Sequence, residues 1–140
     1  MSNKSELVKI FESAAREAGK LIKKEFGKVT ESKVQSKDLG DFVTNTDLET
    51  ENILLNILKK NFPNSSYLTE ESDPFKGNDE TIVIDPIDGT SNFIHGIPSI
   101  GIVIARVYKE EITDGIIFNP VSDELFFATK DKGAWCNNEK

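Results

Sequence analysis

The spacing of apolar residues changes once along this chain, at Pro63. Before Pro63, apolar side chains recur every three or four residues, which is the period of an amphipathic helix. After it, short runs rich in isoleucine, valine and phenylalanine alternate with turn residues, which is typical of strands. Helices followed by consecutive strands predict an α+β fold, with two N-terminal helices packed on an antiparallel sheet.

Two helices are expected before Pro63. The first covers residues 5–26 and ends at Gly27, because glycine readily adopts the left-handed conformation that follows many helices. The second covers residues 48–61, with Thr46 or Asp47 as its N-cap.

The remaining segments are expected to be strands and loops of a single domain, since the 140 residues contain no repeat and no convincing boundary. Residues 37–47 are expected to form a polar loop. Strands are expected at 29–34, 67–68, 81–84, 100–108, 112–118, 124–129 and 134–136.

The composition limits the kinds of binding partner and the cellular compartment that we expect. The 24 acidic residues outnumber the 17 lysines and arginines, so the formal net charge is −7. Such a surface favours cations and disfavours nucleic-acid backbones. The longest apolar stretch, residues 100–105, is too short to span a membrane, and the first residues lack the apolar core of a signal peptide. A single cysteine, Cys136, forms no internal disulfide, so a reducing, cytoplasmic location is expected.

The clearest chemical pattern follows the strand expected at 81–84. That strand would deliver Asp85 to a sheet end, and Asp88 would return across the turn that Pro86 begins. The two carboxylates and the Ile87 carbonyl would form a set of hard oxygens, which suits magnesium. Gly89 allows close approach of the backbone, and the N–H groups after it suit a phosphate. The same residues are also compatible with an ordinary polar turn.

Other charged side chains extend this pattern. Glu70 and Asp47, each by itself a solvated acid or a helix cap, would complete an acidic cluster with Asp85 and Asp88. Two such charges about 4 Å apart repel by about 4 kcal/mol at an effective dielectric of about 20, so a divalent cation explains the cluster better than protons do. Lys37 would either reach a phosphate or remain solvated. The single histidine and single cysteine exclude the usual zinc sites.

Three motifs in order resemble those of the inositol monophosphatase family. They are residues 41–47 (DFVTNTD), residues 68–72 (LTEES) and residues 85–96 (DPIDGTSNFIHG). That family belongs, with fructose-1,6-bisphosphatase, to a magnesium-dependent, lithium-sensitive phosphatase superfamily. The resemblance covers essentially the whole chain and implies the first subdomain of the layered α/β sugar-phosphatase fold.

The resemblance also implies roles for individual residues. The ligands of two or three Mg²⁺ ions, which Mn²⁺ would be able to replace, would be Glu70, Asp85, the carbonyl of Ile87, and Asp88. The contacts to the substrate phosphate would come from Lys37, Asp88, Gly89 and Thr90. The attacking water would be oriented and activated by Glu70 and by Thr90 paired with Asp47.

The implied activity is hydrolysis of a phosphate monoester, with inositol monophosphate as the expected substrate, by a homodimer. Ser91 favours this branch, because nucleotide-bisphosphate and histidinol-phosphate relatives usually carry lysine there. Two alternatives stay open. One is another sugar phosphatase, such as fructose-1,6-bisphosphatase, and the other is a regulatory or binding module, associated with transcription or ribosomes, whose activity is dispensable.

One departure from the family concerns length. Family members run to about twice this length, and their later half carries a Trp-Asp motif whose aspartate completes the second metal site. Residues 1–140 are therefore expected to be an N-terminal metal- and phosphate-binding subdomain, with the C-terminal subdomain absent. An isolated chain of this kind is expected to bind metal weakly.

Overall fold

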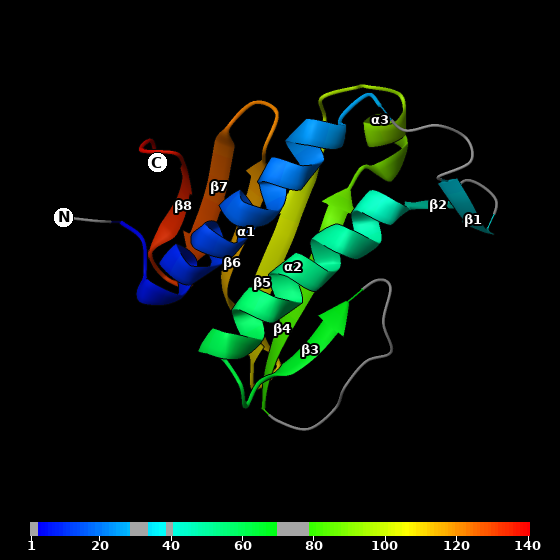
Figure 1. Cartoon of the computed structure of the whole chain (residues 1–140). Coiled ribbons are helices and arrows are strands. Elements are labelled where there is room, and N and C mark those ends of the chain that lie inside the picture. The colour runs from blue at the N-terminus through cyan, green and yellow to red at the C-terminus, as the bar shows by residue number, and fades with distance from the viewer. Residues whose placement is uncertain (1–2, 29–33, 39–40, 70–78) are drawn as a thin grey trace.

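The structure, a computed structural model, describes residues 3–28, 34–38, 41–69 and 79–140, with the backbone alone for 34–38 and 41–43. Two long helices lie side by side on one face of a six-stranded sheet, and a short helix and a two-stranded pair lie near one end (Figure 1). The predicted α+β arrangement of two N-terminal helices on a sheet is confirmed. Within these ranges no helix is long and apolar enough to cross a membrane.

The first helix, α1 (Glu6–Glu25), lies where the apolar period predicts it. Its N-cap is Ser5, whose hydroxyl oxygen accepts the Val8 N–H at 3.1 Å. Gly27 follows the helix with a φ of 73°, as expected for the residue that ends it.

The second helix, α2 (Asn45–Asn61), begins three residues before the predicted start at residue 48. The predicted N-cap, Thr46 or Asp47, is wrong, because Thr44 caps the helix and Asp47 occupies its third position. The apolar period starts only at Leu48, so periodicity alone misses a polar first turn.

The large sheet has the strand order β3-β4-β5-β6-β7-β8. Its strands are β3 (Ser66–Thr69), β4 (Glu80–Asp88), β5 (Gly101–Tyr108), β6 (Glu111–Asn119), β7 (Glu124–Thr129) and β8 (Gly133–Cys136). From β4 to β8 neighbouring strands pair antiparallel, as predicted. The sheet is mixed because β3 and β4 run parallel, so both deliver their C-terminal ends to the same edge.

The small sheet corrects the loop predicted for residues 37–47. It pairs β1 (Val34–Asp38) antiparallel with β2 (Asp41–Thr44). The strand predicted at 29–34 lies outside the described residues except for Val34. Polar strands such as these carry no apolar alternation, so the sequence pattern does not reveal them.

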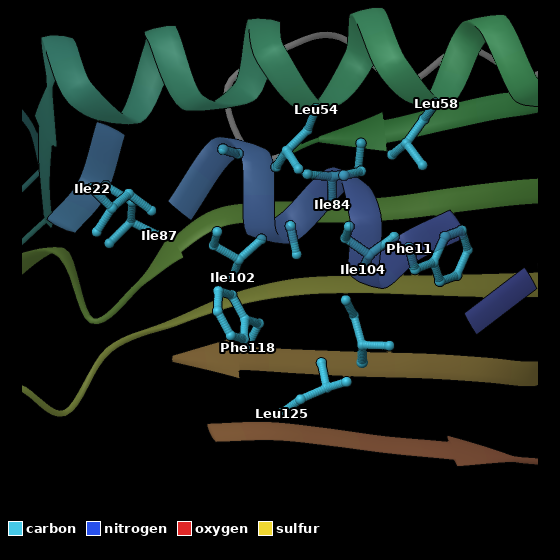
Figure 2. Packing of buried hydrophobic residues seen from close by; sticks show 14 of the residues in the cluster. Phe11, Ile22, Leu54, Leu58, Ile84, Ile87, Ile102, Ile104, Phe118 and Leu125 are labelled. Carbon is cyan, nitrogen blue, oxygen red and sulfur yellow. The ribbon is translucent and has the colours of Figure 1, made fainter. Parts of the chain in front are cut away.

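The core lies between the helix pair and the large sheet (Figure 2). From α1 it takes Phe11, Ile22 and the small residues Ala14, Ala15 and Ala18, and α2 adds Leu54 and Leu58. From the sheet it takes Ile82, Ile84, Ile102, Ile104, Ile116, Phe118, Leu125 and Phe127. Alanines on α1 allow the helix to approach the strands closely.

The opposite face of the large sheet is open. Ile117 is 48% exposed and Phe126 is 43% exposed, although their neighbours Ile116 and Phe127 are buried. Alternate side chains of a strand point to opposite faces, so these residues mark the face that α1 and α2 do not cover.

Candidate active site

The site begins at the C-terminal end of β4. Asp85 pairs with Val103 and Asp88 pairs with Gly101, but the register shifts between them. The sequence predicts that pairing stops at Pro86; instead it skips Pro86 and Ile87 and resumes at Asp88. Pro86 has no N–H to donate, which explains the gap. The irregularity leaves Asp85 half-buried and Asp88 exposed at one edge of the sheet.

A tight turn at Gly89 leads from β4 into α3 (Thr90–Ile94). Gly89 has a φ of 89°, and a Cβ there would lie 2.9 Å from the Ser99 carbonyl oxygen, so only glycine fits without a shift. The buried ring of Phe93 anchors α3 in the core, near the ring of Phe26. This anchoring holds the start of α3 against the end of β4.

Thr90 joins two segments that are distant in sequence. Its hydroxyl lies 2.9 Å from Oδ1 of Asp47 and 3.1 Å from the carbonyl oxygen of Ile87. Asp47 is only 2% exposed and lies in the first turn of α2. The start of α2 and the end of β4 therefore meet at Thr90, near β2 and α3 (Figure 1).

Sequence reasoning missed Thr44, which holds the other oxygen of Asp47. The Thr44 N–H donates to Oδ2 of Asp47 at 3.0 Å, and the Thr44 hydroxyl donates to the same oxygen. In return, the Asp47 N–H donates to the Thr44 hydroxyl at 3.2 Å. This is a capping box, and the spacing of threonine and aspartate three residues apart is the signal that could have revealed it.

Two predicted site residues lie outside what the structure describes. Glu70 is not among the described residues, and for Lys37 only the backbone is described, in β1. The residue before Glu70, Thr69, ends β3 and pairs with Ile84, the residue before Asp85. The parallel pair thus carries β3 to the edge of the sheet where Asp85 lies.

The donor set suits a hard cation. Across the described residues, no group of three or more histidine, cysteine, aspartate or glutamate side chains is arranged to hold a metal ion. The end of β4 nevertheless presents the Asp85 and Asp88 carboxylates and the Ile87 carbonyl within four residues. Oxygen donors of this kind, completed by water, are those that magnesium takes.

Comparison with known proteins identifies the family. The model of the inositol monophosphatase family matches residues 3–140. The chain belongs to this family. Membership agrees with the resemblance seen in the sequence and with the two helices packed on the mixed sheet.

Proteins with similar sequences carry different names. An inositol-1-monophosphatase of Caulobacter vibrioides is 41% identical over 130 residues, which are 91% of this chain and 51% of that protein. A Nus factor SuhB of Pasteurella multocida is 36% identical over 127 residues, 89% of this chain and 48% of that protein. The chain thus spans about half the length of the curated relatives it matches.

A solved structure has the same fold. The extragenic suppressor protein suhB of Bartonella henselae superposes with a TM-score of 0.92 at 36% identity. The match covers 97% of this chain and 54% of that one.

Proposed function

We propose that this chain provides the metal- and phosphate-binding part of a magnesium-dependent phosphatase that hydrolyses inositol monophosphate to inositol and phosphate. The observation that carries the proposal is the Thr90 hydroxyl, 2.9 Å from the buried Asp47 carboxylate and 3.1 Å from the Ile87 carbonyl oxygen at the end of β4. A hydroxyl held by a buried acid beside a cluster of hard oxygens is suited to positioning water at a phosphate.

The ligands of the cation in this proposal are Asp85, Asp88, the carbonyl of Ile87, and Glu70. When bound, Mg²⁺ would neutralise the phosphate and stabilise the leaving alkoxide. The turn at Gly89 supports a phosphate position beside the cation, because the first N–H groups of α3 have no acceptor within the helix. Asp88, Gly89 and Thr90 would contact the phosphate there, and Lys37 would approach it from β1.

Asp47 and Thr90 supply the proton-handling group. Oδ1 of Asp47 accepts the Thr90 proton, so the lone pairs of the Thr90 oxygen are available to a water molecule. Thr90, together with Glu70, would then orient that water. As the water attacks phosphorus, its proton would pass to the Thr90 oxygen while the Thr90 hydroxyl proton passes to Oδ1 of Asp47. Positioned acids and bases of this kind typically contribute about 100-fold or more to a rate.

The proposal is tested by phosphate release from inositol 1-phosphate, with and without Mg²⁺. Two proteins are compared: the 140-residue chain, and the same chain followed by the part of the Caulobacter relative that lies beyond the matched region. We expect magnesium-dependent release by the extended protein and little by the shorter one. Absence of release from the extended protein with either Mg²⁺ or Mn²⁺ would contradict the proposed function.

A charge-matched pair of variants sharpens this test. Asp88→Asn should abolish release and leave the fold intact, because Asp88 is exposed and belongs to the proposed metal site. Asp131→Asn removes the same charge from a distant exposed turn, where the φ of 65° is one that asparagine tolerates. It should retain full activity. Activity of Asp88→Asn within a few-fold of the parent would refute the role given to Asp88.

Two alternatives are outcomes of the same assay. Faster release from fructose 1,6-bisphosphate than from inositol 1-phosphate would favour a sugar bisphosphatase. The name of the Pasteurella relative, a Nus factor, favours a second function as a regulatory or binding module with dispensable activity. That function would be supported if the extended protein folds and binds Mg²⁺ but releases no phosphate.

The proposal includes a homodimeric assembly in the cytoplasm, with a small phosphorylated polyol as partner and no nucleic acid. The net charge of −7 supports the last point, since it opposes binding to a phosphate backbone. Light scattering of the extended protein would measure its oligomeric state.

A further inference from the structure

We propose that Thr44 is a positioning residue of the site, and this inference rests on the proposed function. By holding Oδ2 of Asp47, Thr44 turns Oδ1 toward Thr90 and so decides which acceptor receives the Thr90 proton. Thr44 would act only through Asp47, without touching substrate or metal.

The two oxygens of the Asp47 carboxylate are divided between different partners. Oδ2 accepts the N–H of Thr44 at 3.0 Å and also its hydroxyl, whereas Oδ1 accepts the hydroxyl of Thr90 at 2.9 Å. Hydrogen bonds to an ionised carboxylate are stronger than those between neutral groups. Two such bonds on one oxygen fix the rotation of the carboxylate, and this rotation sets the position of Oδ1.

Burial makes this arrangement rigid. Thr44 is 1% exposed and Asp47 is 2% exposed, so water does not readily replace a lost partner. The main chain also holds Thr44 in place, because Thr44 is the last residue of β2 and the N-cap of α2. A change at Thr44 therefore has a direct route to the carboxylate and, through it, to Thr90.

The Thr90 hydroxyl has one proton, and among the described residues two acceptors lie within hydrogen-bond distance of it. These are Oδ1 of Asp47 at 2.9 Å and the carbonyl oxygen of Ile87 at 3.1 Å. With Oδ1 in place, this nearer acceptor takes the proton, and the Ile87 carbonyl keeps its lone pairs for a cation. If the carboxylate rotates away, the proton turns to Ile87 and the lone pairs of Thr90 point elsewhere.

The competing explanation is that Thr44 only caps α2. Thr44→Gly separates the two roles, because glycine is nearly as good an N-cap but has no hydroxyl. Thr44→Val removes the hydroxyl and keeps the shape, and Thr44→Ser keeps the hydroxyl. Ser5→Ala is the matched control, since it removes the hydroxyl cap of α1 far from Asp47.

The first measurement is phosphate release by the extended protein used above. Thr44→Val and Thr44→Gly should lower kcat about tenfold and leave KM within about twofold, as for the loss of a group that orients a catalytic one. Thr44→Ser should restore kcat, and Ser5→Ala should lower only the melting temperature. Parental kcat in Thr44→Gly, or an equal loss of kcat in Ser5→Ala, would overturn the proposal.

The second measurement needs no activity. In the 140-residue chain with ¹³C-labelled threonine methyl groups, the NMR signal of Thr90 reports the orientation of its side chain. Thr44→Gly should shift this signal, and Ser5→Ala should leave it unchanged. An unshifted Thr90 signal would overturn the positioning role. A shifted signal in a protein that releases no phosphate would instead mean that the proposed function fails while the arrangement of hydrogen bonds stands.

Discussion

The two long helices, α1 and α2, have the same kind of N-cap, but the residues at their third positions have different surroundings. Each has a hydroxyl N-cap that accepts the N–H of the third helical residue, from Val8 to Ser5 at 3.1 Å and from Asp47 to Thr44 at 3.2 Å. In α1 that third residue is a fully buried valine in the core. In α2 it is a buried aspartate that closes a capping box and reaches Thr90.

The second hydrogen bond of each cap shows the same contrast. The Ser5 hydroxyl donates to Oδ2 of the buried Asp114 at 2.9 Å, which also accepts the Thr129 hydroxyl, so the start of α1 is tied to β6 and β7. The Thr44 hydroxyl donates to its own helix, at Asp47. One cap attaches a helix to the sheet, and the other orients a carboxylate. The same local chemistry thus supports either packing or a site, depending on the residue at the third position.

The largest expected effect comes from two separate variants, in each of which the third residue of one long helix is replaced by alanine. In the extended protein, Asp47→Ala should lower kcat about 100-fold or more, because Thr90 loses its carboxylate acceptor and its proton turns to the Ile87 carbonyl. Val8→Ala should leave kcat near the parental value and destabilise the protein by about 2 kcal/mol, through a cavity in the core. Phosphate release and urea unfolding measure the two effects. Equal losses of kcat in both variants would contradict the prediction that the third residue affects activity only in α2.

A smaller effect is expected from metal binding, which concerns only the end of the molecule where α2 begins. At about ten times its dissociation constant, Mg²⁺ or Mn²⁺ should raise the melting temperature by about 5 °C, because it relieves repulsion among carboxylates. Ser5→Ala should melt lower but gain as much from metal as the parent. Asp88→Asn should gain less, and a gain equal to the parent's would place the ion elsewhere.

The smallest effect is expected at the start of α1, on lowering the pH. Burial by itself raises the pKa of Glu12, but hydrogen bonds from Lys4 and Arg16 more than offset this and hold the pKa below its ordinary value of 4.5. A carboxylate with a lowered pKa stabilises the folded state above its unfolded pKa and loses that contribution as the pH falls through the folded pKa. The stabilisation by Glu12 should therefore be complete near neutral pH and be lost progressively as the pH falls below the ordinary glutamate pKa and through the lowered pKa of the folded state.

Urea unfolding of Glu12→Gln measures this contribution. The variant should be less stable than the parent at pH 7 by less than about 1 kcal/mol, since the ion pairs of Glu12 with Lys4 and Arg16 are partly exposed. The difference should vanish toward pH 3. Glu17→Gln, on the exposed side of the same helix, removes the same charge and should show a weaker pH dependence. A Glu12→Gln difference that persists unchanged in acid would rule out the ion pairs as its cause.

Much of the fold follows from local patterns in the sequence. The strand predicted at 124–129 coincides with β7, and α1 differs from its predicted range by one residue at each end. Both segments are rich in apolar residues, because one face of each is buried. The predictions were wrong for β1, β2 and the polar first turn of α2, because these segments have no apolar stripe.

The candidate site was only partly predictable. The sequence pattern predicts a ligand-binding turn at Asp85, Asp88 and Gly89. The structure has a turn there, with a positive φ at Gly89, and the binding of a ligand stays a prediction. The sequence pattern did not identify Thr44, whose role depends on the rotation of a carboxylate. A capping box can be proposed from spacing, but the direction in which its acid points depends on what packs around it.

The amino-acid sequence by itself determined the order of the two long helices and of the strands of the large sheet, and the family to which the chain belongs. Both are encoded in residues that lie close together along the chain. Residue patterns alone did not show that β3 runs parallel to β4 or that Thr90 meets Asp47, 43 positions away; the family resemblance implied the second contact, and the tertiary structure contains both. Such contacts depend on how whole elements pack, because a hydrogen bond between distant segments forms only after the core has brought them together.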